Sequence, residues 1–174
     1  MPGANLPVQL ARLPDLADGA FRAFVRFPAG WSRPGAGHYP VAEEFLVLEG
    51  DLRLNHVTWR GGGYAWIAAN RIRVDSCSAS GCLAFAWFAA GPRWIAGAPA
   101  EPAPSADTVF AHWRDAPGGK LYAGPEHRTW VAPGSQIPEG CEALDLTDLC
   151  WRAHARSETP AERSSVLARV WQRG

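Results

Sequence analysis

The sequence predicts an all-β protein assembled from many short strands. Its 18 glycines and 15 prolines are scattered along 174 residues and divide the chain into short segments. Four of these segments are apolar, rich in aromatic or β-branched residues, and short for a helix: Phe21–Phe27, Phe45–Leu48, Tyr64–Ala68 and Leu83–Ala89. Short strands separated by frequent turns are typical of a β-sandwich or a β-barrel.

Charge and composition argue against several classes of partner. The chain has 17 Lys+Arg and 17 Asp+Glu, whereas nucleic acids and anionic membranes are bound by proteins with a basic surplus. No apolar run approaches the roughly 18 to 20 residues of a membrane-spanning helix. Residues 1–21 lack the pattern of a secretory signal. We therefore expect a cytoplasmic protein that binds neither nucleic acid nor a membrane.

Three features of composition bear on function. All but one of the 17 basic residues are arginine, which forms paired, planar hydrogen bonds to carboxylates. The nine tryptophans suit a large core and also suit the wall of a ligand pocket. The four cysteines form no C-x-x-C pair, and no histidine cluster completes a zinc pattern, so we expect reduced and mostly buried thiols.

The chain divides at a segment rich in proline and alanine. Residues 97–106 contain three prolines and no core-forming residue, which predicts a linker between a first unit, 6–96, and a second unit, 107–174. Asp15–Arg26 and Asp145–Arg156 share the pattern D-L-x-D-x-x-aromatic-R-A-x-x-R. We interpret the second unit as a partial, decayed repeat of the first, or as an extension that covers the first unit.

One helix competes with this all-β prediction near the C-terminus. Thr159, Pro160 and Glu162 form a typical helix start. Apolar residues follow at helical spacing, and Gly174 comes after them: they are Val166, Leu167, Val170 and Trp171. The spacing favours a helix, and the alternative is a strand if the repeat extends to this segment.

Two motifs in the first unit resemble those of the cupins. Pro40–Gly50 matches the tail of the first cupin motif, G-x5-H-x-H-x3-E-x6-G, with six residues between Glu43 and Gly50. Gly63–Arg73 falls where the second motif, G-x5-P-x-G-x2-H-x3-N, belongs, and Gly81–Trp87 resembles the closing strand. Residues 20–90 thus resemble a cupin domain, specifically that of the ChrR-type anti-sigma factors. The resemblance implies an RmlC-like jelly-roll barrel, the cupin double-stranded β-helix.

The resemblance also implies where a metal would bind. In metal-binding cupins, two histidines and the glutamate of the first motif converge with a histidine of the second on a divalent metal. Aligned on Glu43, this sequence has Gly37 and Tyr39 at the first two positions and Arg73 at the last. We therefore expect no metal cofactor bound by this set. A makeshift divalent-metal site of His38, Glu43 and His56 remains open.

Arg73 suggests a replacement for the metal. A glutamate buried without a metal is a costly unpaired charge, and a guanidinium can neutralise it through paired hydrogen bonds. We hypothesise an internal Glu43–Arg73 ion pair. The candidate residues for binding a small anionic or aromatic ligand are these two and five others: Tyr39, Arg71, Trp31, Trp66 and Trp87.

Two functions follow from this reasoning. The first is a metal-free protein that binds a small molecule. The second is a cupin enzyme, a dioxygenase or an isomerase of a small metabolite. In a metal-free isomerase, Glu43 and Tyr39 would act as base and acid. Beyond that pair, no catalytic residue is assigned. The outward row Glu44, Leu46 and Leu48 predicts a homodimer surface.

Overall fold

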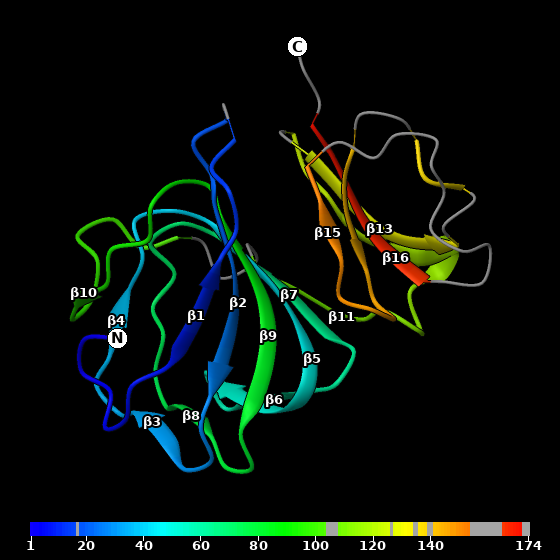
Figure 1. The fold of residues 1–174 in the computed structure, drawn as a ribbon. Helices are drawn as coiled ribbons and strands as arrows, with labels where there is room; N and C mark the ends of the chain where they lie inside the picture. The colour runs from blue at the N-terminus through cyan, green and yellow to red at the C-terminus, as the bar shows by residue number, and fades with distance from the viewer. Residues whose placement is uncertain are drawn as a thin grey trace. The chain divides into compact units, whose positions relative to one another are not determined.

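The computed structural model describes residues 1–16, 18–103, 108–125, 127–133, 136–138, 141–153 and 165–171. The chain forms two compact units, Met1–Phe110 and Ala111–Gly174, each described separately below (Figure 1). The described residues form β-strands and short 3₁₀ turns without an α-helix, so none of them forms a helix able to cross a membrane.

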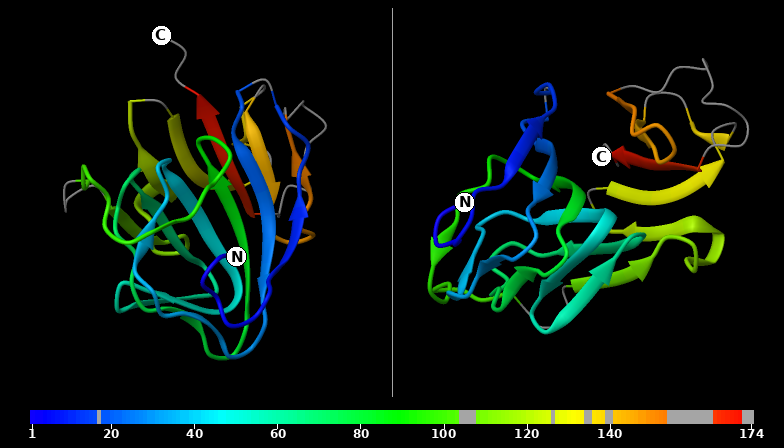
Figure 2. Two further views of the ribbon diagram at one scale, coloured as in Figure 1. Left: turned by 90° about the vertical axis from the view of Figure 1, so that its left-hand side faces the viewer. Right: turned by 60° about the horizontal axis from the view of Figure 1, so that its bottom comes forward.

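The first unit is built from antiparallel strands that curve around a common interior (Figure 2). In chain order the strands are β1 (Gln9–Arg12), β2 (Phe21–Phe27), β3 (Trp31–Arg33), β4 (Gly37–His38), β5 (Glu43–Leu54), β6 (Val57–Arg60), β7 (Gly63–Ile67), β8 (Ser76–Ser78), β9 (Cys82–Phe88), β10 (Ile95–Ala96) and β11 (Thr108–His112), which crosses the boundary between the units.

Strand β5 belongs to two sheets and joins them. Its first half pairs with β9 and β7 in a sheet of order β1-β2-β9-β5-β7-β11. Its second half pairs with β6 and with β8, which in turn pairs with β3. A register shift between Val47 and Glu49 interrupts the pairing with β9, and such a bulge bends the strand. The shared strand lets the two sheets enclose one core, as a jelly-roll barrel requires.

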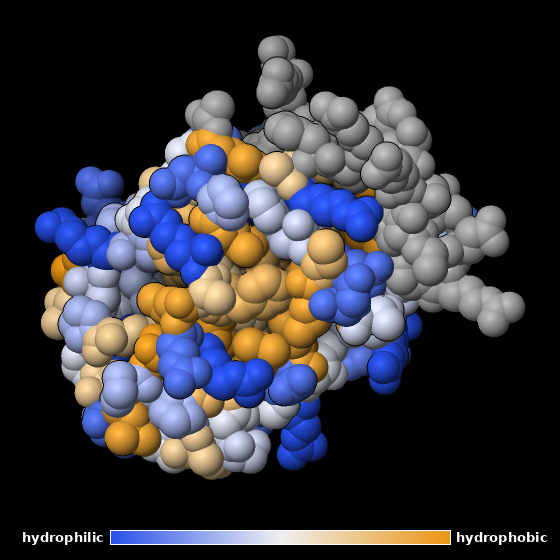
Figure 3. Space-filling model, viewed as in Figure 1, coloured by the Kyte–Doolittle hydropathy of each residue, from blue (hydrophilic) through white to orange (hydrophobic). Residues whose placement is uncertain are grey.

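Alternation along each strand decides which side chains enter the barrel. On β2 the inward residues are Ala23, Val25 and Phe27, and opposite them on β9 are Ala84 and Ala86. The outward residues also make contacts, as where Phe24 lies 5.4 Å from Phe85 between ring centroids. Hydrophobic side chains gather on the surface over β1, β2 and β9, bordered by hydrophilic ones (Figure 3).

The predicted linker lies partly within the first unit. Residues 97–103 belong to that unit, which continues to Phe110. The N–H of Gly97 donates to the carbonyl of Ala36 at 2.9 Å, and the N–H of Ala103 donates to the carbonyl of Asn70 at 3.5 Å. Residues 104–107 lie outside the described part.

The second unit is an antiparallel sheet with its own small core. Its elements are η1 (Pro117–Gly119), β12 (Lys120–Ala123), β13 (His127–Pro133), β14 (Glu142–Asp145), β15 (Trp151–Arg152) and β16 (Ser165–Trp171), and the strand order is β12-β13-β16-β14-β15. Cys141, Ala143, Val166 and Ala168 form the core on one face, with Trp130 packed against them.

Strand β16 shows that the predicted C-terminal helix is wrong. Residues 165–171 are extended and pair with β13 on one side and β14 on the other. Val166 and Ala168 face the core, as alternation in a strand dictates. Hydrogen bonding to two neighbouring strands outweighs the local helical spacing. Thr159, Pro160, Glu162 and Gly174 lie outside the described residues.

The two copies of the repeated pattern have the same local structure where both are described. In each copy the second aspartate accepts a hydrogen bond from the backbone N–H two residues later, the residue between has a positive φ, and a strand begins at the following aromatic residue. The residues are Asp18, Gly19 (φ 70°), Ala20 and Phe21 in the first copy and Asp148, Leu149 (φ 58°), Cys150 and Trp151 in the second. This match supports the repeat, which stays a prediction, and residues 154–156 of it lie outside the described part.

Candidate functional site

A buried ion pair lies inside the first unit. Arg73 Nη1 contacts Glu43 Oε2, and the two side chains are 2% and 12% exposed respectively. Glu43 begins β5, where its register partners are the core residues Ile67 and Phe88, so its side chain shares their inner face. The structure therefore brings together the two residues that the sequence predicted to pair.

The loop that carries Arg73 is held on both sides. The backbone of Arg73 donates to the Gly37 carbonyl at 2.8 Å and accepts from the Gly37 N–H at 3.1 Å. The Asn55 side chain donates from Nδ2 to the Ile72 carbonyl at 3.0 Å and accepts from the Val74 N–H at 2.7 Å. These bonds clamp the residues before and after Arg73, which limits the directions its side chain can take.

Asn55 reaches this loop because of the turn in which it lies. Asn55 and His56 connect β5 to β6 with φ of 52° and 67°. Two consecutive positive φ values are typical of a two-residue hairpin turn, and asparagine tolerates them better than most residues. The turn thus positions the Asn55 side chain as well as reversing the chain.

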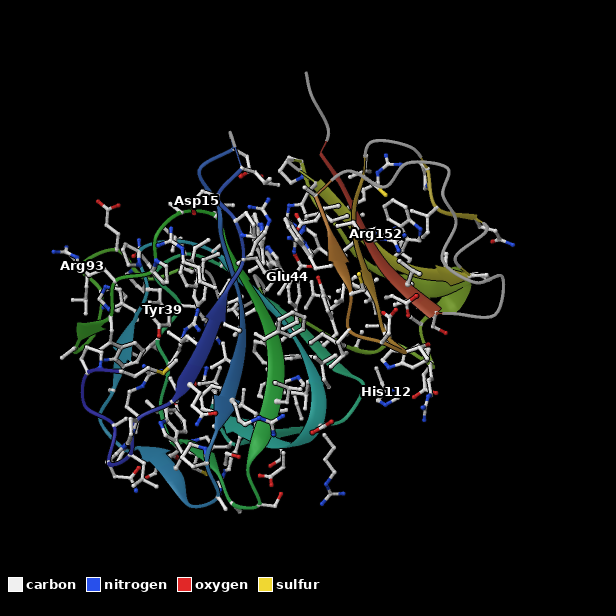
Figure 4. All side chains as sticks on the ribbon, in the orientation of Figure 1. Asp15, Tyr39, Glu44, Arg93, His112 and Arg152 are labelled. Atoms are coloured by element: carbon white, nitrogen blue, oxygen red, sulfur yellow. The ribbon has the colours of Figure 1, made fainter. Side chains whose placement is uncertain are left out.

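Tyr39, which is labelled in Figure 4, contacts both buried arginines of this region, Arg33 and Arg73. The Arg73 Cζ is 4.7 Å from the Tyr39 ring centroid, and Arg33 Nη1 donates to the Tyr39 hydroxyl at 3.3 Å. Together they line a small cavity of about 40 Å³. Its lining residues are Met1, Phe27, Trp31, Arg33, Tyr39, Glu43, Phe45, Leu52, Arg53, Leu54, Arg73 and Ser76.

Arg33 is a site residue that the sequence reasoning missed. It is 4% exposed, and its Cζ lies 3.4 Å from the ring centroid of Trp94, a cation–π contact. The sequence offered only a weak signal: Arg33 stands two residues after the candidate Trp31, so the two side chains share one face of a strand. No comparable signal marks Trp94, which lies in an irregular segment just before β10.

Trp94 fills the space at the first histidine position of the cupin motif. A Cβ atom added at Gly37 would collide with the Trp94 ring and would lie 2.6 Å from the Ile95 carbonyl oxygen. No side chain fits at Gly37 while Trp94 keeps its place. The absence of a histidine at this position is thus matched by an aromatic ring that occupies the vacated volume.

The residues at the four cupin positions do not fit a divalent metal. Gly37 has no side chain, and Arg73 is a cation that contacts Glu43, the carboxylate at the third position. The residue at the second position, Tyr39, is buried between aromatic rings, with Phe88 at 5.1 Å and Trp94 at 5.2 Å between centroids. A cation beside the carboxylate repels a second cation, and a metal would have to displace it.

The alternative metal set of His38, Glu43 and His56 is not brought together, which corrects that expectation. His38 Nδ1 lies 3.1 Å from the Gly97 carbonyl oxygen, because His38 alternates with the inward Tyr39. His56 is 67% exposed on the β5–β6 turn, with Nδ1 3.0 Å from an Asp75 carboxylate oxygen. Within the described residues, no three His, Cys, Asp or Glu side chains cluster as metal ligands would.

Of the three predicted pocket tryptophans, only Trp31 lines the cavity. Trp66 and Trp87 are both register partners of Glu44, and Glu44 points to the opposite face of the sheet from Glu43. Alternation therefore takes both rings out of the barrel interior, which corrects their predicted place. Arg71 is half-buried and does not line the cavity either.

The row Glu44, Leu46 and Leu48, which the sequence predicts to form a homodimer surface, includes polar contacts within the chain. Glu44 is 3% exposed and accepts a 2.6 Å hydrogen bond from the Tyr64 hydroxyl, and Leu46 is 1% exposed. These contacts lie within a single chain and do not test dimer formation, so the homodimer stays a prediction.

Burial affects the acid–base behaviour of Arg73. Removal from water lowers the pKa of Arg73 to about 9, while Tyr39 opposes this shift and the positive charge of Arg33 adds to it. A guanidinium with a pKa of about 9 is still protonated at neutral pH. The buried charges on the cavity are therefore two positive ones, on Arg33 and Arg73, and the negative charge of Glu43, while the exposed Arg53 lines its edge.

A larger hollow in the first unit has a different character. Its volume is about 670 Å³, and it lies between residues 6–9 and the ends of β2 and β9. Most of its lining side chains are apolar, and its charged pair, Arg26 and Glu49, is exposed with 3.8 Å between Nη1 and Oε2. Because it lacks converging buried polar groups, we take the smaller cavity as the candidate site.

Comparison with solved structures identifies the fold. A protein from Nostoc punctiforme proposed to be a dioxygenase superposes with a TM-score of 0.69 at 14% identity, over 97% of this chain and 74% of that one. A cupin 2 conserved barrel domain protein from Leptotrichia buccalis matches with a TM-score of 0.55 at 12% identity, over 95% of this chain and 89% of that one. This chain has the cupin fold.

A third structure agrees with this identification. The Ylba protein of E. coli superposes with a TM-score of 0.55 at 14% identity, covering 98% of this chain and 81% of that one. No family model matches the sequence, and no curated protein shows significant similarity to it. Identities this low identify the cupin fold alone, and the ChrR-like subtype stays a prediction.

Proposed function

We propose that this protein is a small-molecule-binding cupin in which the Glu43–Arg73 ion pair takes the place of the usual metal. The observation that carries the proposal is the contact between these two buried side chains, which occupy cupin ligand positions and line one cavity. A guanidinium beside the carboxylate supplies the positive charge that a metal would otherwise supply.

The surroundings of the pair support the same interpretation. Trp94 excludes a side chain at Gly37, and the clamp from Gly37 and Asn55 holds the Arg73 loop against the cavity. A salt bridge in low dielectric is stabilising only when its geometry is well defined, because desolvation of both charges is expensive. The backbone hydrogen bonds to Gly37 and the side-chain hydrogen bonds of Asn55 fix the geometry of the salt bridge.

Metal content tests the first half of the proposal. Protein purified without added metal is analysed by inductively coupled plasma mass spectrometry after dialysis. We expect every first-row divalent metal to be far below one ion per chain. Stoichiometric iron, nickel, manganese or zinc would overturn the metal-free assignment.

Thermal-shift measurements test the second half. The protein is screened against organic acids, sugars and aromatic metabolites, and a hit is a compound that raises the melting temperature in wild type. A ligand at 100 times its Kd stabilises a folded protein by about 2.7 kcal/mol, which is readily measured. If no compound stabilises wild type while Arg73→Ala lowers its stability strongly, the pair is structural and the binding function is rejected.

The alternative function is a cupin enzyme acting on a small metabolite. It is favoured by the presence of Tyr39 and Glu43 on one cavity, where they can act as acid and base in an isomerisation. The contact between Arg73 and Glu43 weighs against it, since a neighbouring guanidinium makes a carboxylate a weaker base. Turnover of any stabilising compound, abolished in Tyr39→Phe, would favour the enzyme over the binding protein.

Two further expectations from the sequence belong to this proposal, the homodimer and the cytoplasmic location. Light scattering coupled to size-exclusion chromatography measures the solution mass, and twice the chain mass is expected. A strictly monomeric species rejects the dimer.

A further inference from the structure

The charges around the small cavity do not balance. Arg33 and Arg73 are 4% and 2% exposed, and Glu43 contacts Arg73. In the described part of the chain, Arg33 has no carboxylate partner: its contacts are the Tyr39 hydroxyl and the rings of aromatic residues, chiefly Trp94. One buried positive charge is therefore left without a counter-charge, which is costly in a low-dielectric interior.

Several buried hydrogen-bond donors on this cavity also lack acceptors. They are Trp31 Nε1, Arg33 Nε, Arg73 Nε and Arg73 Nη2, none of which has a hydrogen-bond partner within the described residues. One buried acceptor on the cavity, Glu43 Oε2, contacts Arg73 Nη1 without a hydrogen bond, so these donors outnumber it. The three side chains all line the same cavity and are all more than nine-tenths buried. Buried donors in native proteins are nearly always paired, so a group of them around one space indicates an acceptor that binds there.

The size of the space limits what that acceptor can be. One water molecule needs about 10–15 Å³ of such volume, so the cavity of about 40 Å³ holds roughly three water-sized atoms. Formate has this size, and acetate is one methyl group larger. A six-membered aromatic ring has about twice as many heavy atoms as this volume holds, so an aromatic ligand does not fit.

We propose that the cavity between Arg33 and Arg73 binds a short monocarboxylate of formate or acetate size. A single negative charge neutralises the excess of the two buried arginines over Glu43, whereas a dianion such as sulfate would exceed it. A planar carboxylate accepts the forked N–H groups of guanidinium in pairs, which a spherical chloride does not. This inference rests on the proposed function, because it requires that Arg73 and Glu43 pair without a metal.

Isothermal titration calorimetry with sodium formate and sodium acetate tests the proposal. Wild-type protein is dialysed into a chloride buffer, and chloride and sulfate titrations at matched ionic strength serve as comparisons. We expect saturable binding of formate or acetate and none of sulfate. Arg33→Met removes the unbalanced charge and one of the donors, and it should weaken carboxylate binding by at least about tenfold.

Two further variants complete the experiment. Arg93→Met changes an exposed arginine outside the cavity, and it should bind the carboxylate as wild type does. Trp31→Phe keeps an aromatic ring and removes only the Nε1 donor, so it should weaken binding even if Arg33→Met fails to fold. Each variant is first checked for a cooperative thermal transition.

The outcomes separate this inference from the proposed function. Metal-free wild type that binds neither formate nor acetate overturns the carboxylate site and leaves the metal-free cupin intact. Unchanged carboxylate binding in Arg33→Met shows that the carboxylate binds elsewhere. If Arg33→Met does not fold, unchanged binding in Trp31→Phe leads to the same conclusion. Sulfate binding as tight as that of formate overturns the ligand class. A stoichiometric metal overturns the proposed function itself.

Discussion

The two units each contain a buried glutamate–arginine pair, built in different ways. In the second unit Glu142 and Arg169 are direct register partners on β14 and β16, with 3.7 Å between Arg169 Nη1 and Glu142 Oε2. Glu142 also accepts a 2.8 Å hydrogen bond from Trp151 Nε1 on β15. In the first unit, Glu43 at the start of β5 meets Arg73 from a loop between β7 and β8.

Strand pairing alone creates the Glu142–Arg169 pair, whereas the Glu43–Arg73 pair depends on how a loop is held against the barrel. Cross-strand partners such as Glu142 and Arg169 are neighbours wherever the two strands pair, since sheet geometry alone places them side by side. Glu43 and Arg73 become neighbours only because Asn55 and Gly37 hold a loop against the barrel interior. The Glu43–Arg73 pair therefore depends on residues from several segments of the chain, and it lines a cavity together with further polar groups.

The largest expected effect comes from Arg73→Met. This change removes the guanidinium that contacts Glu43, so the free energy of unfolding in urea should fall by about 3–5 kcal/mol. The double variant Glu43→Leu with Arg73→Met should regain most of the loss, because two apolar side chains need no counter-charge. A loss below about 1 kcal/mol in the single variant would show that the pair contributes little.

A matched change in the second unit sharpens the comparison. Arg169→Met removes the arginine of the other pair and should also lower the free energy of unfolding. Carboxylate binding measured by calorimetry should nevertheless stay at the wild-type value in this variant, whereas Arg73→Met should abolish it. Equal effects of both changes on binding would mean that the two pairs do not differ in role.

The next largest effect is expected for Gly37→Ala. The new methyl group collides with the Trp94 ring and the Ile95 carbonyl, so the free energy of unfolding should fall by about 2–3 kcal/mol. Pairing it with Trp94→Leu should restore part of the loss if the ring is the main obstacle, as a double-mutant cycle would measure. Additive effects of the two changes would show that Trp94 does not fill the vacated histidine space.

Asn55→Gly should have a smaller effect. Glycine tolerates the positive φ at this position, so the change removes only the two side-chain hydrogen bonds that clamp the Arg73 loop, worth about 1–2 kcal/mol together. The adjacent His56→Gly is the control, because it loses only an exposed ion pair to Asp75 worth less than about 1 kcal/mol. Carboxylate binding should weaken in Asn55→Gly and not in His56→Gly.

The smallest effects are expected for the cysteine thiols, and each unit has one buried and one more accessible thiol. Burial raises the pKa of Cys82 to about 12 and also raises the pKa of Cys141, so neither thiol forms the reactive thiolate near neutral pH. Cys150 is exposed and Cys77 is half-buried. Alkylation of native protein at pH 8, followed by mass spectrometry, should modify Cys150 first and leave Cys82 and Cys141 unmodified until the chain unfolds. Early modification of Cys82 would contradict its burial.

Part of the site was predictable because it depends on local pattern. The spacing from Glu43 to Gly50 marks a cupin strand, and the residues flanking His38 could be assigned inward by alternation alone. The need of a buried carboxylate for a counter-charge then indicated Arg73. Each step uses only residues that are close in sequence or that match a motif.

Other predictions failed where sheet pairing decides the outcome. Trp66 and Trp87 lie in the segments that resemble cupin motifs, but both pair in register with Glu44, so their side chains point away from the cavity. The apolar run that begins at Val166 has helical spacing, but β13 and β14 pair with it on both sides and make it a strand. Neither register nor pairing partner can be obtained from one segment alone.

The sequence by itself determined the all-β class, the resemblance to cupins and the partnership of Glu43 with Arg73. These depend on periodicity, on motif spacing and on the cost of an isolated buried charge, all of which are properties of the chain. Only the tertiary structure decided that Arg33 and Trp94 belong to the site, because segments distant in sequence converge there. The single unbalanced charge, from which we infer a monocarboxylate, is visible only when those segments are in place.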